Sequence, residues 1–513
     1  MIGAESLVRT LIASGVDTCF ANPGTSEMHF VAALDRAPGM RSILGLFEGV
    51  VTGGADAYAR MTGKPAATLM HCGPGLANGL SLLHNAMRAR VPIVNIVGDQ
   101  ATYHAPLDPP LATDTAGLAR PASAWVRKVT RTEMLGAEAA AAIQAARASS
   151  GIATLILPSD VSWNEGGEVG KPLAVPARPK VAADVVREAA RLLRSREETL
   201  ILISGEALSE KGLALAHRIA ATTGARLSAQ TFNTRVARGR GRYPLQRIPY
   251  VVDDAVRENA GVKNLILVGT GEPVTFFAYP NKPGIATPKD AKVHALARPL
   301  DDVLDALARL ADELAAPKPT LPERPSPEIR RGRITPEGAA ETLAALLPEQ
   351  SIVIEEAITL RNFFYAALMN AAPHDSLENI GGAIGAGPPL ATGAAVAAPR
   401  RRVVAVQADG SAMYTIQALW TQAREKLDVT TIILNNRKYA VLFKELADVG
   451  ATPGQTANDL FELNRPDIDW LRMAESMGVE AARADSLEKF ADLLRHSFGR
   501  RGPFLIDLAL ESA

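Results

Sequence analysis

The chain has 513 residues, of which 47% are hydrophobic and 21% are charged, a composition that supports large folded cores and argues against extensive disorder. Its 55 lysines and arginines balance 55 aspartates and glutamates, which argues against an extended surface for nucleic acid or anionic membranes. The two cysteines are too few for a disulfide scaffold or a zinc cluster. No secretory signal pattern and no run of about 20 apolar residues is found, so we expect a cytoplasmic protein with no membrane or nucleic-acid partner.

Three blocks of alternating helix and strand patterns follow one another along the chain. We place them at residues 1–164, 181–316 and 334–513. The connector Glu165–Lys180 carries three glycines and three prolines, and the connector Pro317–Arg333 carries five prolines. The sequence therefore predicts three domains joined by two linkers.

The predicted elements alternate in type within each block. In chain order the clearest are the helix Ala4–Ser14, a strand ending at Phe20, the helix Val50–Met61, the strands Ala67–Met70, Ile93–Val97 and Ala153–Leu157, the helix Asp184–Arg194, the strand Leu200–Ile203, the helix Lys211–Thr223, and the strands Asn264–Val268, Val403–Val406, Val429–Leu434 and Phe504–Leu508. This alternation is typical of parallel sheets covered by helices on both faces. We expect an α/β fold of three doubly wound parallel-sheet domains.

The first block contains a glutamate at an unusual place. Glu48 stands between an apolar strand and a helix of small residues, where we expect a carboxylate to be partly buried and available for chemistry. A glutamate at a helix start is also a favourable partner of the helix dipole, and the sequence leaves both interpretations open. Two further turns stand at strand ends, around Thr25 and around His71-Cys72-Gly73.

The third block contains a carboxylate and an amide at the ends of two strands. Asp409 follows an apolar β-branched run, and Asn436 comes 27 residues later, after a helix and a second such run. Both strand ends of a βαβ unit open on the same edge of the sheet, where the two oxygens can share a Mg²⁺ ion. Asp-Gly and Asn-Asn are also ordinary turn residues, so the motif alone does not decide the function.

Taken together, these motifs resemble those of the thiamine-diphosphate (ThDP) dependent 2-oxo acid decarboxylases and carboligases. Asp409-Gly410-Ser411 and Asn435-Asn436 are similar to the family's diphosphate motif, although Ala408 replaces its first glycine and leaves the backbone less freedom there. Tyr58-Ala59-Arg60 and Gly73-Pro74-Gly75 also match, and the resemblance covers nearly the whole chain. It implies pyrimidine-binding, central and diphosphate-binding domains, with ThDP and Mg²⁺ as cofactors.

The resemblance also implies residue roles. Glu48 would hold the aminopyrimidine ring and exchange a proton with it, and Ile384 and Gly382 would bend and contact the cofactor. The remaining implied contacts are Thr359, Gly410, Ser411 and Tyr439 with the cofactor, Asp409, Asn436 and the Lys438 carbonyl with the metal, and Thr25, His71, Val441 and Leu442 with the substrate. Ile384 also suits ordinary core packing. His71, a candidate proton relay, equally suits a buried histidine bonded to a carbonyl.

Two groups within the family are similar to this chain. Benzoylformate decarboxylases match in length, in Thr415–Thr421 and in a histidine at His71, but their second active-site histidine falls on or near Ala278. Acetolactate synthase large subunits share the Cys72–Gly75 turn but not the residues that select their second substrate. Their central domain holds FAD, which we do not expect here because Gly269-Thr270-Gly271 lacks the usual third glycine. Glu445 is unusual beside a 2-oxo acid and is expected to pair with Lys444 or with solvent.

The resemblance implies an enzyme, a lyase or transferase, that decarboxylates or ligates 2-oxo acids in the manner of acetolactate synthase or benzoylformate decarboxylase. Two alternatives stay open: a ThDP-dependent C–C lyase on a 2-hydroxyacyl thioester or diketone, and a ThDP-binding partner protein of low activity. In the family the active site forms between two subunits, with Glu48 from one and Asp409 from the other. We therefore expect a homodimer or homotetramer.

Overall fold

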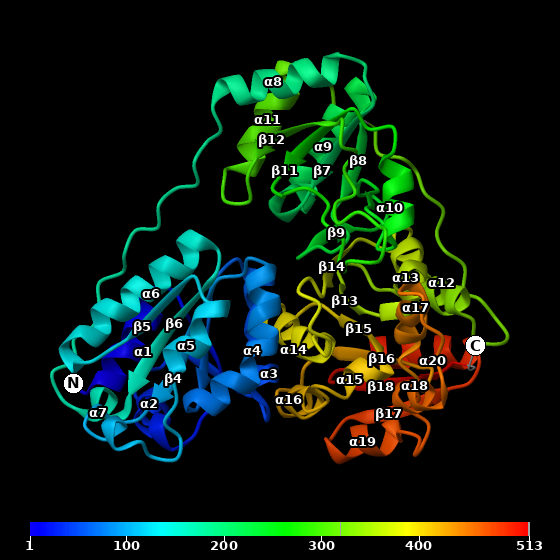
Figure 1. Ribbon diagram of the computed structural model, residues 1–513. Coiled ribbons are helices and arrows are strands. Elements are labelled where there is room, and N and C mark those ends of the chain that lie inside the picture. The colour runs from blue at the N-terminus through cyan, green and yellow to red at the C-terminus, as the bar shows by residue number, and fades with distance from the viewer. Residues whose placement is uncertain (319, 511–513) are drawn as a thin grey trace.

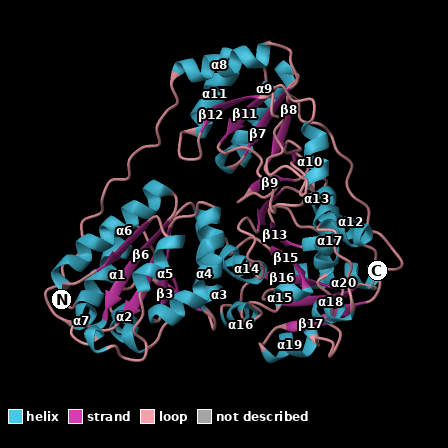
Figure 2. Cartoon of the chain, in the orientation of Figure 1, coloured by secondary structure: helices cyan, strands magenta, loops and turns pink. Residues whose placement is uncertain are grey.

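The computed structural model describes residues 1–318 and 320–510, so residues 319 and 511–513 of the predicted linker and third block lie outside the described residues. Three sheets stand at the corners of a triangle, with the central sheet of the sequence at the top (Figure 1). Helices and strands alternate within each corner (Figure 2). The expected α/β class with three parallel sheets is confirmed. No helix in the described part of the chain is long and apolar enough to cross a membrane.

The N-terminal sheet has six strands in the order β2-β1-β3-β4-β6-β5, and all its pairs are parallel. Its middle strands β3, β4 and β6 are buried along their whole length, as strands covered by helices on both faces should be. The strands are β1 Thr18–Asn22, β2 Arg41–Leu44, β3 Ala66–Met70, β4 Ile93–Asp99, β5 Trp125–Lys128 and β6 Ile152–Pro158, and the helices are α1 Gly3–Ala13, α2 Met28–Asp35, α3 Glu48–Thr62, α4 Cys72–Arg88, α5 Thr115–Ala119, α6 Leu135–Ser149 and α7 Ser159–Trp163.

The central sheet has five parallel strands in the order β10-β8-β7-β11-β12. Residues 166–182, which lead into it, have no regular secondary structure, in keeping with the proline and glycine content of that connector. The strands are β7 Thr199–Ile203, β8 Arg226–Ala229, β10 Gln246–Arg247, β11 Asn264–Val268 and β12 Lys292–Ala297, and the helices are α8 Ala183–Arg194, α9 Glu210–Thr223, α10 Val252–Asn259 and α11 Val303–Glu313.

The C-terminal sheet has seven strands in the order β17-β18-β16-β15-β13-β14-β9. Six of them are parallel, β13 Ile352–Glu356, β14 His374–Glu378, β15 Val403–Ala408, β16 Val429–Asn435, β17 Glu480–Ala484 and β18 Phe504–Ala509. Its helices are α12 Pro336–Leu346, α13 Arg361–Leu368, α14 Gly387–Ala397, α15 Asp409–Ala412, α16 Ala418–Arg424, α17 Ala440–Asp448, α18 Gln455–Phe461, α19 Trp470–Ser476 and α20 Leu487–Phe498.

The seventh strand, β9 Val236–Arg238, was not predicted. It comes from the central third of the chain and pairs antiparallel with β14 at the sheet edge. Three residues are too few to give an alternating sequence pattern, so only the tertiary structure reveals it. Arg238 of this strand and Arg247 each lie 3.8 Å from the centre of the Tyr365 ring, and these two cation–π contacts help fix the central sheet against the C-terminal one.

Helices α3 and α14 join the N-terminal and C-terminal sheets. A side chain at Gly393 of α14 would lie 1.9 Å from the backbone oxygen of Gly54 of α3, so glycine is needed for this close approach. The buried Arg60 of α3 pairs with Asp56 at 2.6 Å and donates to the carbonyl oxygens of Glu378 and Thr234. One guanidinium thus ties all three parts of the chain together.

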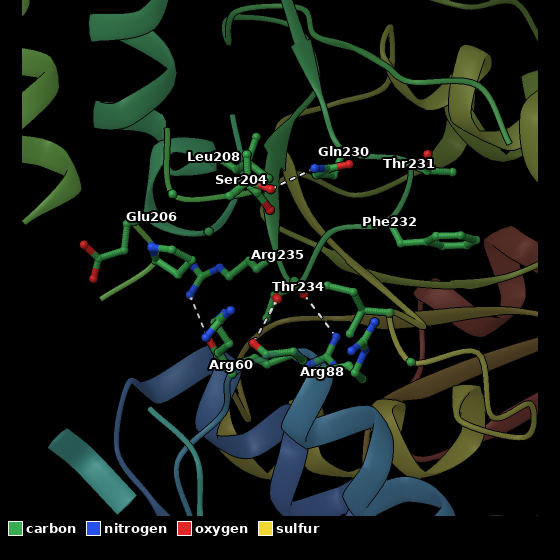
Figure 3. Close-up of a pocket in the computed structure, with 18 of the residues that line it drawn as sticks. Arg60, Arg88, Ser204, Glu206, Leu208, Gln230, Thr231, Phe232, Thr234 and Arg235 are labelled. Atoms are coloured by element: carbon green, nitrogen blue, oxygen red, sulfur yellow. Dashed lines mark hydrogen bonds between the residues drawn. The ribbon is translucent and has the colours of Figure 1, made fainter. Parts of the chain in front are cut away.

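A cavity of about 1380 Å³ lies where the three sheets meet, beyond the carboxyl ends of the central strands. Figure 3 shows Ser204, Glu206 and Gln230 on its central wall and Arg60 and Arg88 on the side of the N-terminal helices. The loop Gly269-Thr270-Gly271 also lines it, whereas Glu48, His71, Asp409 and Asn436 do not. The residues expected to carry chemistry therefore lie elsewhere.

Candidate active site

The first group of candidate residues gathers at the carboxyl edge of the C-terminal sheet. Asp409 is the first residue of α15, directly after β15, and its side chain is 2% exposed. One carboxylate oxygen accepts from its neighbour Gly410 N at 2.7 Å, and the other accepts from Arg437 N at 2.6 Å. The structure thereby brings the Asp409 turn and the loop after β16 together, at the edge where parallel strands end.

Burial raises the pKa of Asp409 to about 6, although backbone N–H groups oppose the shift. A buried carboxylate whose charge is incompletely compensated is stabilised by a bound cation. The Asn436 amide oxygen, which accepts from Lys438 N at 3.2 Å, supplies a second hard oxygen in the same loop. These two oxygen ligands, with the Lys438 carbonyl, suit Mg²⁺, which prefers oxygen ligands and keeps positions for water and phosphate.

Ala408 does not strain this turn. Its backbone has φ −70° and ψ 143°, an extended conformation that any residue adopts, so the glycine usual in the family is not required for its φ. Gly410 is different in its surroundings, because a side chain there would lie 2.4 Å from the Tyr439 ring. Ser411 is buried, and its hydroxyl donates to the Ala408 carbonyl at 3.1 Å.

Glu356 organises the loop that carries Gly382 and Ile384, and sequence reasoning missed it. Its buried carboxylate accepts from Gly385 N at 3.0 Å, Gly387 N at 2.9 Å and the Gln407 amide at 2.9 Å, and from Asn379 and Ala386 N. Burial raises its pKa despite these donors. A carboxylate at the end of an apolar strand was the available signal, in the pair Glu355-Glu356.

Three residues expected to contact the cofactor, Gly382, Ile384 and Thr359, lie in loops near this carboxylate. Gly382 has φ +83°, and a side chain there would lie 2.4 Å from the Phe276 ring, which accounts for the glycine. Ile384 is half-buried and stands outside the buried hydrophobic cores, so plain core packing does not explain it. Thr359 is exposed in the short 3₁₀ turn Ile358–Leu360, and among the described residues no hydrogen bond joins it to the Asp409 turn.

The second group lies at the carboxyl edge of the N-terminal sheet. Glu48 is the first residue of α3 and is 9% exposed. Its Oε2 accepts from the Asn78 amide at 3.1 Å, and a side chain at Gly75 would lie 3.2 Å from Oε1. A nearly buried carboxylate with one amide donor keeps a free oxygen to bind a ring nitrogen.

His71 belongs to a cluster of polar side chains in the same region. Its Nδ1 lies 2.9 Å from Glu27 Oε2 and 3.0 Å from the Ser26 hydroxyl. Glu27 is fully buried and also accepts from Gly24 N at 2.7 Å and from Ser26 at 2.6 Å. A carboxylate on one ring nitrogen fixes the orientation of the imidazole, as a proton relay requires.

Cys72 and Thr25 border this cluster. The Cys72 thiol lies 3.1 Å from the Ser26 hydroxyl, and burial raises its pKa to about 11, with the negative charges of Glu27 and Asp99 adding to the shift. Thr25 is exposed in the 3₁₀ turn Thr25–Glu27. The sequence singled out Thr25 and His71 here but not the Ser26-Glu27 pair that holds the histidine.

Helix α17 carries the residues expected to contact the substrate, and its Glu445 has other partners than the sequence led us to expect. Val441 is half-buried and Leu442 is 38% exposed on this helix. Glu445 accepts from the Tyr279 hydroxyl at 2.6 Å and from the Tyr250 hydroxyl at 3.2 Å, so its expected pairing with Lys444 or solvent was wrong. Lys444 instead pairs with Asp448. Both tyrosines lie in the central third of the chain, too far in sequence for a pattern to connect them.

The two groups are not hydrogen-bonded to each other within one chain. Among the residues that the structure describes, no hydrogen bond links Glu48 or His71 to Asp409 or Ser411. The N-terminal and C-terminal sheets instead meet through α3 and α14 and through Asn85, which donates to the Ala383 carbonyl at 2.8 Å.

A buried carboxylate at an oxygen-rich turn and a second carboxylate on a separate parallel sheet agree with the resemblance to thiamine-diphosphate enzymes. Comparison with known families agrees, because residues 1–118 match the N-terminal TPP binding domain of thiamine pyrophosphate enzymes and residues 362–508 match the C-terminal TPP binding domain. The chain belongs to the thiamine pyrophosphate enzyme family.

Relatives place the chain more closely within the family. It is 50% identical to IlvX of Mycobacterium tuberculosis, provisionally named an acetolactate synthase large subunit, over 100% of this chain and 99% of that protein. It is 30% identical to benzoylformate decarboxylase of Pseudomonas aeruginosa, over 97% of each. The solved 4-hydroxybenzoylformate decarboxylase of Rhodococcus jostii RHA1 superposes with a TM-score of 0.84 at 24% identity, covering all of both chains, which shows a shared fold.

Proposed function

We propose that this protein catalyses the ThDP- and Mg²⁺-dependent decarboxylation of a 2-oxo acid, with release of the product as an aldehyde or its ligation to a second carbonyl compound. The observation that carries the proposal is the Asp409 turn, where a buried carboxylate with a raised pKa and the Asn436 loop form an oxygen site suited to a metal-bound diphosphate. The relatives that share the whole length of the chain support this class of reaction.

The bound cofactor would supply the electron sink for loss of CO₂. In this proposal Asp409, Asn436 and the Lys438 carbonyl hold the metal, Ser411 and Gly410 the diphosphate, and Gly382, Ile384 and Tyr439 the rest of the cofactor. Glu48 binds and exchanges a proton at the aminopyrimidine. Its one described side-chain partner, Asn78, leaves an oxygen available for that contact.

His71 moves a proton at the reacting carbon in this proposal, and Glu27 positions it. The imidazole is fixed from one side by Glu27 and Ser26, and a side chain at Gly24 would lie 2.3 Å from its Cγ, so the ring sits tightly against the turn. Val441 and Leu442 of α17 would supply apolar contact to the substrate, and an apolar environment favours loss of a charged carboxylate.

The central experiment measures CO₂ release and products from aliphatic and aromatic 2-oxo acids after reconstitution with ThDP and Mg²⁺. Glu48→Gln should lower CO₂ release by at least about 100-fold, the usual contribution of a positioned acid–base group, while the exposed Glu349→Gln serves as the matched control. Cleavage of a 2-hydroxyacyl thioester without CO₂ release would favour the lyase alternative. If the protein binds ThDP but releases no CO₂ and forms no product from any of the acids, the proposed reaction is refuted.

We also propose that the site is completed by a second copy of the chain, since the Glu48 and Asp409 halves are not joined within one. Mixing inactive Glu48→Gln and Asp409→Ala proteins after reversible dissociation tests this. If each site combines Glu48 of one copy with Asp409 of the other, hybrids contain one intact site, and random mixing restores roughly a quarter of wild-type activity. No recovery from verified hybrids would contradict a shared site.

A further inference from the structure

The cluster around His71 combines three different metal-binding side chains. One ligand atom from each of Glu27, His71 and Cys72 lies within 4.8 Å of the ligand atoms of the other two. Carboxylate oxygen, imidazole nitrogen and thiolate sulfur are the three donor types that bind Zn²⁺ in proteins. Proton relay at the substrate uses the first two of these groups, and it gives no role to the thiol.

The spacing suits a tetrahedral ion. Bonds of about 2.0–2.3 Å place the ligand atoms of a tetrahedral zinc about 3.5 Å apart. His71 Nδ1 and Glu27 Oε2 are 2.9 Å apart. The Ser26 hydroxyl lies between the three ligand residues, 3.0 Å from His71 Nδ1 and 3.1 Å from Cys72 Sγ, so an ion takes this place when the Ser26 side chain rotates away. Three protein ligands leave the fourth position to water.

The electrostatic environment favours a cation. Glu27 is fully buried, and Asp99 at the end of β4 is 4% exposed, so two carboxylates are near the thiol in a region that excludes bulk water. Asp99 has a partner, Lys128, at 2.7 Å, but that lysine is 40% exposed. The His71 side chain is 26% exposed, so the cluster is open to solvent at this ligand.

We infer that Glu27, His71 and Cys72 form a regulatory site for Zn²⁺ or a similarly thiophilic divalent ion, separate from the Mg²⁺ site at Asp409. Binding forms a Zn–S bond and releases the Cys72 proton to solvent, with no redox change. Because the ion occupies the imidazole nitrogen and the carboxylate that position the relay, it inhibits the enzyme reversibly. This consequence rests on the proposed function, whereas binding itself does not.

Selectivity follows from ligand softness. Mg²⁺ needs octahedral oxygen coordination and does not compete for a thiolate, whereas Zn²⁺ and Co²⁺ accept sulfur. The site is therefore tested in the reconstituted enzyme with ThDP and excess Mg²⁺, which keeps the Asp409 turn occupied. Retention of ThDP is measured in parallel, so that displacement of Mg²⁺ is distinguished from binding at Cys72.

Cobalt titration of this holoenzyme reads out the thiolate directly. We expect one Co²⁺ per chain with a sulfur-to-cobalt charge-transfer absorption, retained in Cys19→Ala, whose thiol is buried in the core of the N-terminal sheet. Cys72→Ala should lose the absorption and weaken binding by about 100-fold or more, beyond the loss seen for outer-shell residues. A wild-type protein without that absorption, or a Cys72→Ala protein that keeps it, overturns the site.

Zinc inhibition is the second measurement. Zn²⁺ at one equivalent per chain should abolish most CO₂ release, a chelator followed by fresh Mg²⁺ should restore it, and Cys72→Ala should need about 100-fold more Zn²⁺ for the same fractional loss relative to its own metal-free rate. Cobalt binding in a protein that turns over no 2-oxo acid refutes the proposed function and leaves the site standing. An active enzyme that binds no cobalt refutes the metal site and leaves the proposed function standing.

Discussion

The attachment of α17 to the central third of the chain is the structural feature with the clearest quantitative consequence. Tyr279 and Tyr250 donate to the two oxygens of Glu445 at 2.6 and 3.2 Å. Burial raises the pKa of Tyr250 to about 12, and the pKa of Tyr279 is raised as well, so both hydroxyls stay protonated donors at physiological pH. The two bonds hold the helix that carries Val441 and Leu442.

Tyr279→Phe removes one oxygen atom and the shorter of the two bonds. A hydrogen bond to a charged acceptor contributes about 1.5–3 kcal/mol, and because Glu445 is only half-buried we expect the lower value, about 1.5 kcal/mol. That energy corresponds to about a tenfold increase in the open population of α17. Tyr250→Phe, which loses the longer bond, should have a smaller effect in the same direction.

Amide hydrogen exchange in the reconstituted enzyme measures this opening directly. Amides of α17 should exchange about tenfold faster in Tyr279→Phe, while those of α16 serve as the internal control. Because the bond lies outside the Asp409 turn, ThDP affinity should be unchanged and KM for the substrate should rise. Unchanged exchange in α17 with both tyrosines replaced by phenylalanine would refute the reasoning that these bonds anchor the helix.

Two further predictions concern the metal site and the helix interface. Asp409 has a raised pKa of about 6 and must be ionised to hold a metal. The affinity for Mg²⁺ should therefore fall about tenfold per pH unit below pH 6 and level off above it. Mg²⁺-dependent ThDP binding measured between about pH 5 and pH 8 tests this prediction, and a flat profile contradicts it. Gly393→Ala should lower the thermal midpoint by overpacking α3 against α14 at a cost of about 1–3 kcal/mol or more, although alanine is the better helix former. Gly454→Ala, with open space around it, is the control, and a raised midpoint in Gly393→Ala would show that the interface has room.

The sequence by itself determined the fold class, because apolar β-branched strands alternating with helices have few solutions other than parallel sheets covered on both faces. It also indicated the family, because the motifs at Glu48, Asp409 and Asn436 resemble those of thiamine-diphosphate enzymes, and the comparisons confirm the family. Parallel strands end at one sheet edge, so a local pattern was enough to bring Asp409 to the loop after β16.

Only the tertiary structure decided which side chains surround these residues. Glu27 beside His71, Glu356 beneath the Gly382 loop and Tyr279 against Glu445 are contacts between segments separated by 44, 29 and 166 positions. Such contacts depend on how the sheets pack against one another, and no sequence periodicity records that packing. The same holds for β9, whose three residues join the C-terminal sheet because an open strand edge there has unpaired backbone groups to satisfy.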